Sequence, residues 1–165
     1  MSSTIVLTRN CLALVDSEDL EGLTPYRWFT VGAAPYLRAA RSITVAPYRK
    51  QFFYMQREIL GLPPDREPVV DHVNGNPLDN RRQNLRLCSA RENSWNRRRR
   101  ATVFGLSPFI GVIWRSHARA FQAHARRDGR FVHLGWFKDP VAGAHARDAA
   151  VLAFRGAFAV LNFPT

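Results

Sequence analysis

The stretch VVDHVNGNPLDNRRQNLRLCSARENSWN, residues 69–96, constrains the fold more than any other part of the chain. Its two leading valines predict a short strand, and residues 74–80 are rich in Asn, Gly, Pro and Asp, which favour turns. Residues 85–88 alternate between apolar and polar side chains, as a returning strand does. Ser89 followed by Glu92 is the sequence of a capping box, so a helix is expected to begin there. The stretch therefore predicts strand, loop, strand and helix in succession.

Polar side chains in this stretch are expected to share one site. Asp71 and His72 end the first strand, and Asn93 lies in the first turn of a helix that is expected to pack back over the hairpin. A carboxylate and a carboxamide oxygen are hard ligands that suit Mg²⁺. A neutral imidazole beside them is able to deprotonate a water. The alternative is a strand end followed by a turn, since Asn is common wherever loops need left-handed backbone. An isolated Asp-His pair would favour that alternative, whereas the helix asparagine and the capping box favour a functional site.

The string DHVNGNPLDNRRQNLR resembles the HNH nucleases, in the variant of phage and intron homing nucleases whose third position is asparagine, here Asn93. The resemblance implies a ββα-metal core at about residues 69–98. It implies His72 as the general base and Asn84 as the residue that orients this base and braces the loop. Asp71 and Asn93 would be the ligands of Mg²⁺ or Mn²⁺.

The residues before this stretch are expected to form a small β-sheet scaffold. Short strands are predicted at residues 4–7, 11–15, 35–39 and 51–54, and helical turns at 16–23 and 55–60. The segment also resembles the lead-in of phage HNH proteins, with an "LT…alVD" opening and a "YMxREI" helix. That lead-in commonly carries a histidine where this chain has Gln56, and the consequence of the difference stays open.

The charge of +11 and the pI near 11.1 point to a polyanionic partner. Residues 1–67 carry 8 cations against 7 acids, so this part is expected to be a scaffold more than a nucleic-acid surface. Residues 68–100 and 101–165 each carry 8 cations against 3 acids. Nearly all the cations are arginines, whose planar fork suits phosphates and guanine edges. A genome rich in G and C would also favour arginine codons.

A run of four arginines, residues 97–100, marks the expected boundary between a nuclease domain, residues 1–100, and a second domain, residues 101–165. The run has two interpretations. Cations at a helix C-terminus are favourable without any partner. Because the flanks are also basic, we favour phosphate contact by a tether between two DNA-bound modules.

The second domain is predicted to be a three-stranded antiparallel sheet with one packed helix, which makes the whole chain α+β. Strands are expected at residues 110–115, 120–126 and 131–137, with an Asp-Gly hairpin signal between the last two. Asp139 and Pro140 then provide an N-cap and a proline at the first helical position, and an alanine-rich helix runs to Gly156.

This unit, with its GVIW, LGWF and LNF motifs, resembles the plant ethylene-response-factor (APETALA-type) DNA-binding domain over roughly Gly105 to Phe163. The resemblance implies that the sheet enters the major groove. His133 and Phe131 stand where the family usually has tryptophan and arginine, so its sequence preference is not transferred. The alternative is a solvated polar sheet face. Trp114 and Trp136 are expected to pack in the core or at the sheet edge. The predicted DNA-binding residues are Arg86, Arg97, Arg98, Arg99, Arg100, Arg115, Gln122, His124, Arg126, Phe131 and His133.

Taken together, these features predict a metal-dependent homing-type DNA endonuclease that nicks double-stranded DNA, since one site per chain cuts one strand. No apolar run of membrane length and no leader is present, so we expect a cytoplasmic protein in a phage-infected or bacterial cell, with no membrane or obligate protein partner.

Cys11 and Cys88 form no C-x-x-C pair, which argues against structural zinc. Two alternatives stay open: a non-catalytic DNA-binding regulator with a degenerate nuclease core, and a nuclease or binder directed to RNA.

Overall fold

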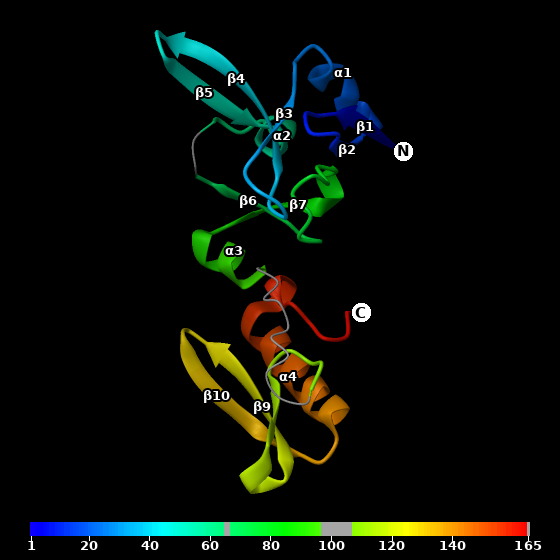
Figure 1. The fold of residues 1–165 in the computed structure, drawn as a ribbon, viewed down its shortest axis with the longest axis vertical. Coiled ribbons are helices and arrows are strands. Elements are labelled where there is room, and N and C mark those ends of the chain that lie inside the picture. The colour runs from blue at the N-terminus through cyan, green and yellow to red at the C-terminus, as the bar shows by residue number, and fades with distance from the viewer. Residues whose placement is uncertain (65–66, 97–106, 165) are drawn as a thin grey trace. The chain divides into compact units, whose positions relative to one another are not determined.

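The computed structural model describes residues 1–64, 67–96 and 107–164, and it divides the chain into two compact units, Met1–Asn93 and Ser94–Thr165. Both units mix α and β structure, with several small antiparallel sheets and few helices (Figure 1). The arginine run at 97–100 lies outside the described residues. Within the described part of the chain, no helix is long and apolar enough to cross a membrane.

The first unit contains three small antiparallel sheets, with strand orders β1-β2, β3-β4-β5 and β6-β7. Its strands are β1 (Ser2–Val6), β2 (Leu12–Asp16), β3 (Phe29–Val31), β4 (Arg38–Ala46), β5 (Arg49–Tyr54), β6 (Val69–His72) and β7 (Leu85–Cys88). Its helices are α1 (Leu20–Leu23), α2 (Met55–Ile59) and α3 (Ala90–Asn96), the last of which spans the division between the units. Short 3-10 turns lie at Ser17–Asp19 and Arg82–Asn84.

The core of this unit forms where β2, α2 and β7 meet. Along β2 the burial alternates, so that Ala13 and Val15 are fully buried, and Met55 of α2 is fully buried beside them. Trp28 packs into the same cluster and donates from Nε1 to the Leu23 carbonyl (2.8 Å). Leu85 brings β7 into the core. Each fully buried aliphatic side chain of this size contributes about 1.5–3 kcal/mol, so the β6–β7 hairpin is anchored to the best-packed part of the unit.

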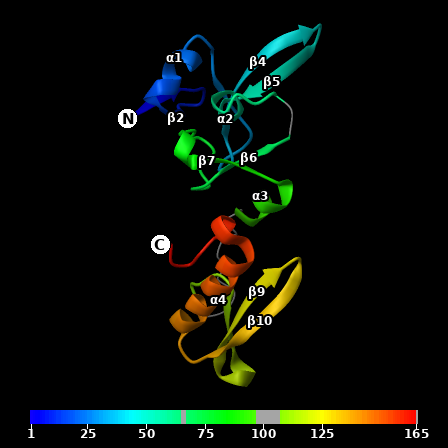
Figure 2. The same cartoon turned by 180° about the vertical axis from the view of Figure 1, so that it is seen from behind.

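The β4–β5 hairpin is longer than the sequence predicts. The predicted strand at 35–39 overlaps β4 only at residues 38 and 39, β3 was not predicted, and the chain turns at Pro47 and Tyr48. Figures 1 and 2 show β4 and β5 extending away from the rest of the first unit. Residues 43–50 are all exposed, so their sequence has no reason to alternate between apolar and polar residues.

The second unit is a three-stranded antiparallel sheet of order β10-β9-β8 with one long helix packed on it (Figure 1). Its elements are β8 (Val112–Arg115), β9 (Ala120–Arg127), β10 (Arg130–Phe137) and α4 (Pro140–Arg155), with 3-10 turns at Ser116–Ala118 and Gly156–Phe158. Asp139 caps α4 by accepting from the backbone N–H groups of Val141 and Ala142. Ala144 and Val151 are buried against the sheet.

Two of the sequence motifs in this unit have direct structural causes. Gly111 of the GVIW motif has φ +76°, and a Cβ there would lie 2.5 Å from the His124 carbonyl oxygen, so only glycine fits. The buried carboxylate of Asp148 accepts from the backbone N–H groups of Asn162 (2.7 Å) and Phe163 (2.9 Å). The LNF motif therefore ties the end of the chain to α4.

A bulge in β10 corrects the prediction for Trp136. The register shifts between His133 and Gly135, after which Trp136 pairs with Gln122. The shift moves Trp136 to the polar face of the sheet, where it is 47 % exposed. Of the two predicted places, the core and the sheet edge, the core is wrong for Trp136, because a period-two pattern does not record an extra residue; β10 is an edge strand of the sheet. Trp114 does pack, edge-on against Phe121 at 4.9 Å between ring centroids.

Candidate active site

Asn84 closes the loop between β6 and β7. Its Oδ1 accepts from the backbone N–H of Asn74 (2.9 Å), and its Nδ2 donates to the carbonyl of Asp79 (2.7 Å). Asn74 in turn donates from its side chain to the Asp79 carboxylate (2.7 Å). Asn84 itself is only 6 % exposed. These bonds tie both ends of the loop to one buried amide, which is what a loop-bracing residue requires.

The loop is also fixed to the core of its unit through β2. Leu14 donates from its backbone N–H to the carbonyl of Leu78 (2.9 Å), and Asn80 donates to the carbonyl of Leu14 (2.7 Å). The Arg81 guanidinium holds both oxygens of Asp79 (2.8 and 2.7 Å), and this hydrogen bonding is the main reason why the pKa of the Asp79 carboxyl is lowered. The loop is therefore held rigidly beside the end of β6.

His72 lies at that end of β6 and is 8 % exposed. Burial lowers the pKa of its imidazole; the nearby Arg38 charge also lowers it, whereas Asn80 and Asp71 act in the opposite direction. His72 is therefore neutral at neutral pH. Its Nε2 lies 3.4 Å from Oδ1 of the fully buried Asn80. Because an amide oxygen only accepts, a hydrogen bond between these two atoms requires the ring proton to be on Nε2, which leaves the lone pair on Nδ1.

Asn80 was not among the predicted site residues, and the contact with His72 was expected from Asn84. The signal for it was weak, since Asn80 belongs to a loop in which asparagine is common for backbone reasons alone. Asn80 differs from the other loop asparagines in being completely buried. Its burial results from the docking of the loop against β2, which the neighbouring residues in the sequence do not indicate.

Asp71 and Arg86 form an ion pair across β6 and β7, where they are direct partners in the register. The Arg86 guanidinium donates from two nitrogens to Oδ2 of Asp71, at 2.9 and 2.7 Å. The Arg86 side chain is only 17 % exposed. Arg86 was predicted to bind DNA, which stays a prediction; the structure pairs its charge with the carboxylate predicted to hold a metal.

Asn93, the second predicted metal ligand, lies in the first turn of α3, where its backbone N–H donates to the Ser89 carbonyl (3.0 Å). The capping box is confirmed, because Ser89 N–H donates to Glu92 (2.8 Å) and Glu92 N–H donates to the Ser89 hydroxyl (3.2 Å). The buried Cys88 thiol lies close to both predicted metal-binding segments. Burial and then the Asp71 charge raise the pKa of this thiol to about 11, while the Arg86 charge and the backbone of Asn93 act in the opposite direction. Asp71 and the start of α3 therefore adjoin a common neutral thiol.

Arg57 and Gln56 are two buried polar residues of α2, and sequence reasoning missed Arg57. The Arg57 guanidinium donates to the carbonyls of Pro63 (2.6 Å), Pro68 (2.6 Å) and Glu67 (3.1 Å), so it fixes the segment that leads into β6. Gln56 is 6 % exposed, and its Oε1 has no hydrogen-bond partner among the described residues.

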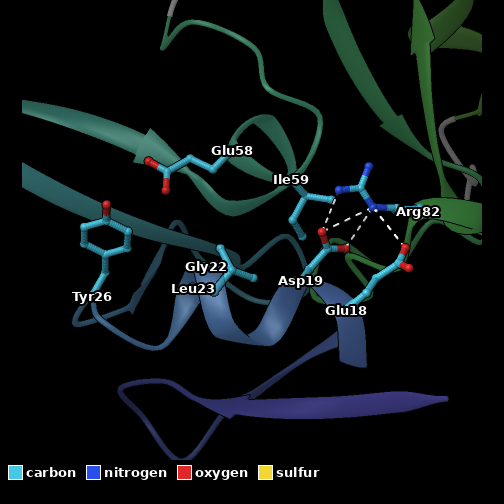
Figure 3. A pocket seen from close by; sticks show the side chains of 8 residues that line it. All are labelled: Glu18, Asp19, Gly22, Leu23, Tyr26, Glu58, Ile59 and Arg82. Atoms are coloured by element: carbon cyan, nitrogen blue, oxygen red, sulfur yellow. Dashed lines mark hydrogen bonds and ion pairs between the residues drawn. The ribbon is translucent and has the colours of Figure 1, made fainter.

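The carboxylates of Asp16, Glu18 and Asp19 form an acidic cluster that includes none of the predicted metal ligands. Arg82 binds this cluster, donating from its backbone N–H to Asp16 (2.8 Å) and from NH2 to Asp19 (2.6 Å). Figure 3 shows the Arg82 guanidinium beside Asp19 and Glu18. These three residues line a hollow of about 370 Å³, which Tyr26 and Glu58 also line. The arginine thus neutralises these carboxylates and connects the 3-10 turn before β7 to the end of β2 and to the 3-10 turn before α1.

In the second unit, the predicted DNA-binding residues that are described lie on one face of the sheet. Arg115 donates to Oε1 of Gln122 (3.0 Å), which turns the Gln122 amide nitrogen toward Nδ1 of His133 (3.2 Å). Phe131 stacks on His124 with 4.7 Å between the ring centroids. Burial lowers the pKa of His124, and the Arg115 charge lowers it further. Strand alternation and the bulge place Arg126 and Trp136 on the same face.

The comparisons with known proteins agree with the geometry of the first unit. Residues 62–95, which include β6, β7 and most of α3, match the family described as HNH endonuclease. Protein 3.8 of Escherichia phage T7 is 32 % identical over 62 residues, which are 37 % of this chain and 49 % of that protein. The chain thus spans about half the length of this curated relative. The family match supports a nuclease and, because HNH nucleases generally depend on divalent metals, a metal-dependent one.

Proposed function

We propose that this chain is a metal-dependent DNA endonuclease of the homing type, with β6, β7 and α3 as its ββα-metal core. The observation that carries the proposal is that the residues matching the HNH endonuclease family are those that place a neutral, buried His72 beside a rigid loop closed by Asn84. The C-terminal sheet is proposed to bind duplex DNA in the major groove, as the resemblance to APETALA-type domains implies. Its substrate would be DNA in the cytoplasm of a phage-infected or bacterial cell.

In the proposed mechanism His72 removes a proton from a water aligned with the scissile phosphorus. The lone pair on Nδ1 receives that proton, because the contact with Asn80 keeps the other proton on Nε2. Asn84 keeps the loop, and with it Asn80, in place. Attack of the deprotonated water on phosphorus forms a new P–O bond and breaks the P–O3′ bond. The leaving 3′ oxygen takes a proton from solvent water, which gives a 5′-phosphate and a 3′-hydroxyl end. With one such site in each chain, the first product is a nick.

The donor set at Asp71 and Asn93 fits Mg²⁺ or Mn²⁺, because it offers a carboxylate and an amide oxygen next to a thiol that burial keeps protonated. Such an ion, when bound, supplies Lewis-acid stabilisation to the phosphate and to the leaving oxygen. The Asp71 carboxylate binds Arg86 through Oδ2, so Arg86 helps to orient it.

The direct test is a nicking assay on supercoiled plasmid with Mg²⁺, Mn²⁺ or excess chelator. We expect metal-dependent conversion to the open circle before any linear product, and 5′-phosphate ends on mapping. RNA hairpins in the same assay test the RNA-directed alternative. Equal cleavage in chelator, or cleavage of RNA alone, would contradict the proposal.

The pH profile follows from the lowered pKa of His72. The single-turnover rate should rise with pH through the folded-state pKa, so the midpoint of the rise should lie below about pH 6.5, the ordinary value. The stability of the protein without metal should change over the same range. The unfolded chain binds the His72 proton more tightly, so stability should fall as pH drops below about 6.5. A rate that still climbs well above this pH would assign the base to another group.

A second candidate, a DNA-binding regulator with an inactive nuclease core, is favoured by one observation. Arg86 places a positive charge directly on the carboxylate that is proposed to bind the metal. If this ion pair persists in the presence of metal, the chain would bind DNA without cutting it. The nicking assay separates this candidate from the endonuclease.

A further inference from the structure

The net charge of residues 1–67 is near zero, but its positive and negative charges lie in different parts of the segment. Residues 1–24 carry one arginine and four acids, whereas residues 25–57 carry six cations and no acid at all. Four of those six cations, Arg38, Arg41, Arg49 and Lys50, lie on the β4–β5 hairpin. The segment expected to be a scaffold therefore contains one strongly basic element, and this element projects from its unit (Figures 1 and 2).

Most of the positive charge on the hairpin is available to a partner. Arg41 is neutralised by Glu58, at 2.5 Å between nitrogen and oxygen. Arg49 and Lys50 are exposed and make no ion pair with any carboxylate in the described parts of the chain. Arg38 is also exposed and lies over the Tyr54 ring, 5.6 Å from its centroid. A polyanion is the partner whose charge complements such a surface.

The tip of the hairpin shows a second, independent feature. Tyr48 occupies the turn with φ +62°, a conformation that costs a non-glycine residue energy, and its side chain is fully exposed. Ile43, Val45 and Phe52 on the strands are each more than 40 % exposed. An aromatic ring held in solvent on left-handed backbone gains nothing within the chain, which points to a contact outside it.

We propose that the β4–β5 hairpin is a DNA-binding arm of the nuclease unit, in which Arg49 and Lys50 contact phosphates while the ribbon lies in the major groove with Tyr48 at its tip. The major groove admits a two-stranded β-ribbon, and the positive charge of the hairpin complements the negative phosphates on both sides of the groove. The inference rests on the proposed function only in taking duplex DNA as the partner.

The position of the arm connects it with the nuclease site. The register pairs Ala40 with Tyr54, Ser42 with Phe52 and Thr44 with Lys50, so Arg38, Phe52 and Lys50 share one face of the ribbon. Arg38 at the base of that face is close enough to His72 for its charge to act on the imidazole. A strand of DNA that follows this face from Lys50 to Arg38 therefore reaches the end of β6.

The test compares two double substitutions of equal charge in the full-length protein. R49Q/K50Q removes two cations from the arm, and R9Q/R27Q removes two exposed cations of the same unit outside it. Binding to a labelled duplex of mixed sequence is measured without divalent metal over a series of salt concentrations. The arm variant should lower the slope of log affinity against log salt by about 1.8, and the control variant should leave the slope unchanged. Melting temperatures show that both variants are folded.

Tyr48→Gly provides a second readout. Glycine relieves the left-handed backbone, so the melting temperature should rise, while the affinity for the duplex should fall at least a few-fold. An unchanged affinity together with an unchanged slope in R49Q/K50Q would overturn the arm. Equal losses on a single strand of the same sequence would overturn its placement in the major groove. The binding assay contains no metal, so its result does not depend on cleavage. If the wild-type protein fails to nick plasmid DNA, but R49Q/K50Q still lowers the salt slope of binding, the arm is supported and the nuclease proposal is refuted.

Discussion

Replacing His72 with alanine should lower the single-turnover rate of DNA cleavage by about 10²–10⁴-fold, the range that a general base supplies. DNA affinity should change little, because His72 is 8 % exposed and carries no charge at neutral pH that a phosphate could use. The effect should fall on the chemical step alone. To measure that step directly, DNA is bound by saturating enzyme without metal, and the single-turnover reaction is started by adding Mg²⁺.

A suitable control is His145→Ala, which removes an exposed histidine of α4 that stacks on Phe163. This variant should cleave at the wild-type rate. His72→Ala also removes a buried ring, so its melting temperature and its affinity for duplex DNA are needed beside the rate. A folded variant that binds DNA and cleaves it at the wild-type rate would exclude His72 as the base and would return Asp71 and Asn93 to the turn-and-strand interpretation.

The order of strand, loop, strand and helix around His72 could be predicted because each element is specified by neighbouring residues. The turn-forming residues 74–80, the alternation at 85–88 and the capping box at Ser89 all act over a few positions of sequence. The same applies to α4, whose cap Asp139 precedes a proline. Local propensity and capping are the part of folding that a single sequence records most directly.

The partners of the site residues could not be predicted in the same way. Asn80 meets His72 only because the loop docks on β2, and Arg86 meets Asp71 because the register of β6 and β7 pairs them. An arginine in a basic sequence resembles a phosphate ligand until its partner is known. Arg57 shows the same limit, since the carbonyls that it binds belong to a segment without regular structure.

The bulge in β10 and the charge of the β4–β5 hairpin show a second limit of prediction from sequence. One extra residue between His133 and Gly135 reverses the face on which Trp136 lies, and a periodic pattern has no means of recording it. Averaging charge over residues 1–67 likewise hid the basic arm, because the acids near Glu18 offset its cations in the sum while lying on other elements. Charge has to be assigned to elements before it indicates a partner.

Replacing Asp71 with alanine should both destabilise the first unit and abolish cleavage, and the two effects should be separable. The Asp71 and Arg86 side chains are 7 % and 17 % exposed, so removal of the carboxylate takes an opposite charge away from a largely buried guanidinium. The expected loss is about 2–4 kcal/mol in the free energy of unfolding, somewhat less than for a fully buried pair. Urea denaturation without metal measures it.

The double variant D71A/R86A distinguishes the structural role of Asp71 from its proposed chemical role. Removing both partners eliminates the stranded charge, so the double variant should recover at least about 1 kcal/mol relative to D71A alone. It should recover no cleavage, because the proposed metal ligand is still missing. R86A alone should retain metal-dependent cleavage, since Asp71 remains. If D71A/R86A instead cleaves at the wild-type rate, Asp71 serves only to neutralise Arg86, and the metal must be held by other residues.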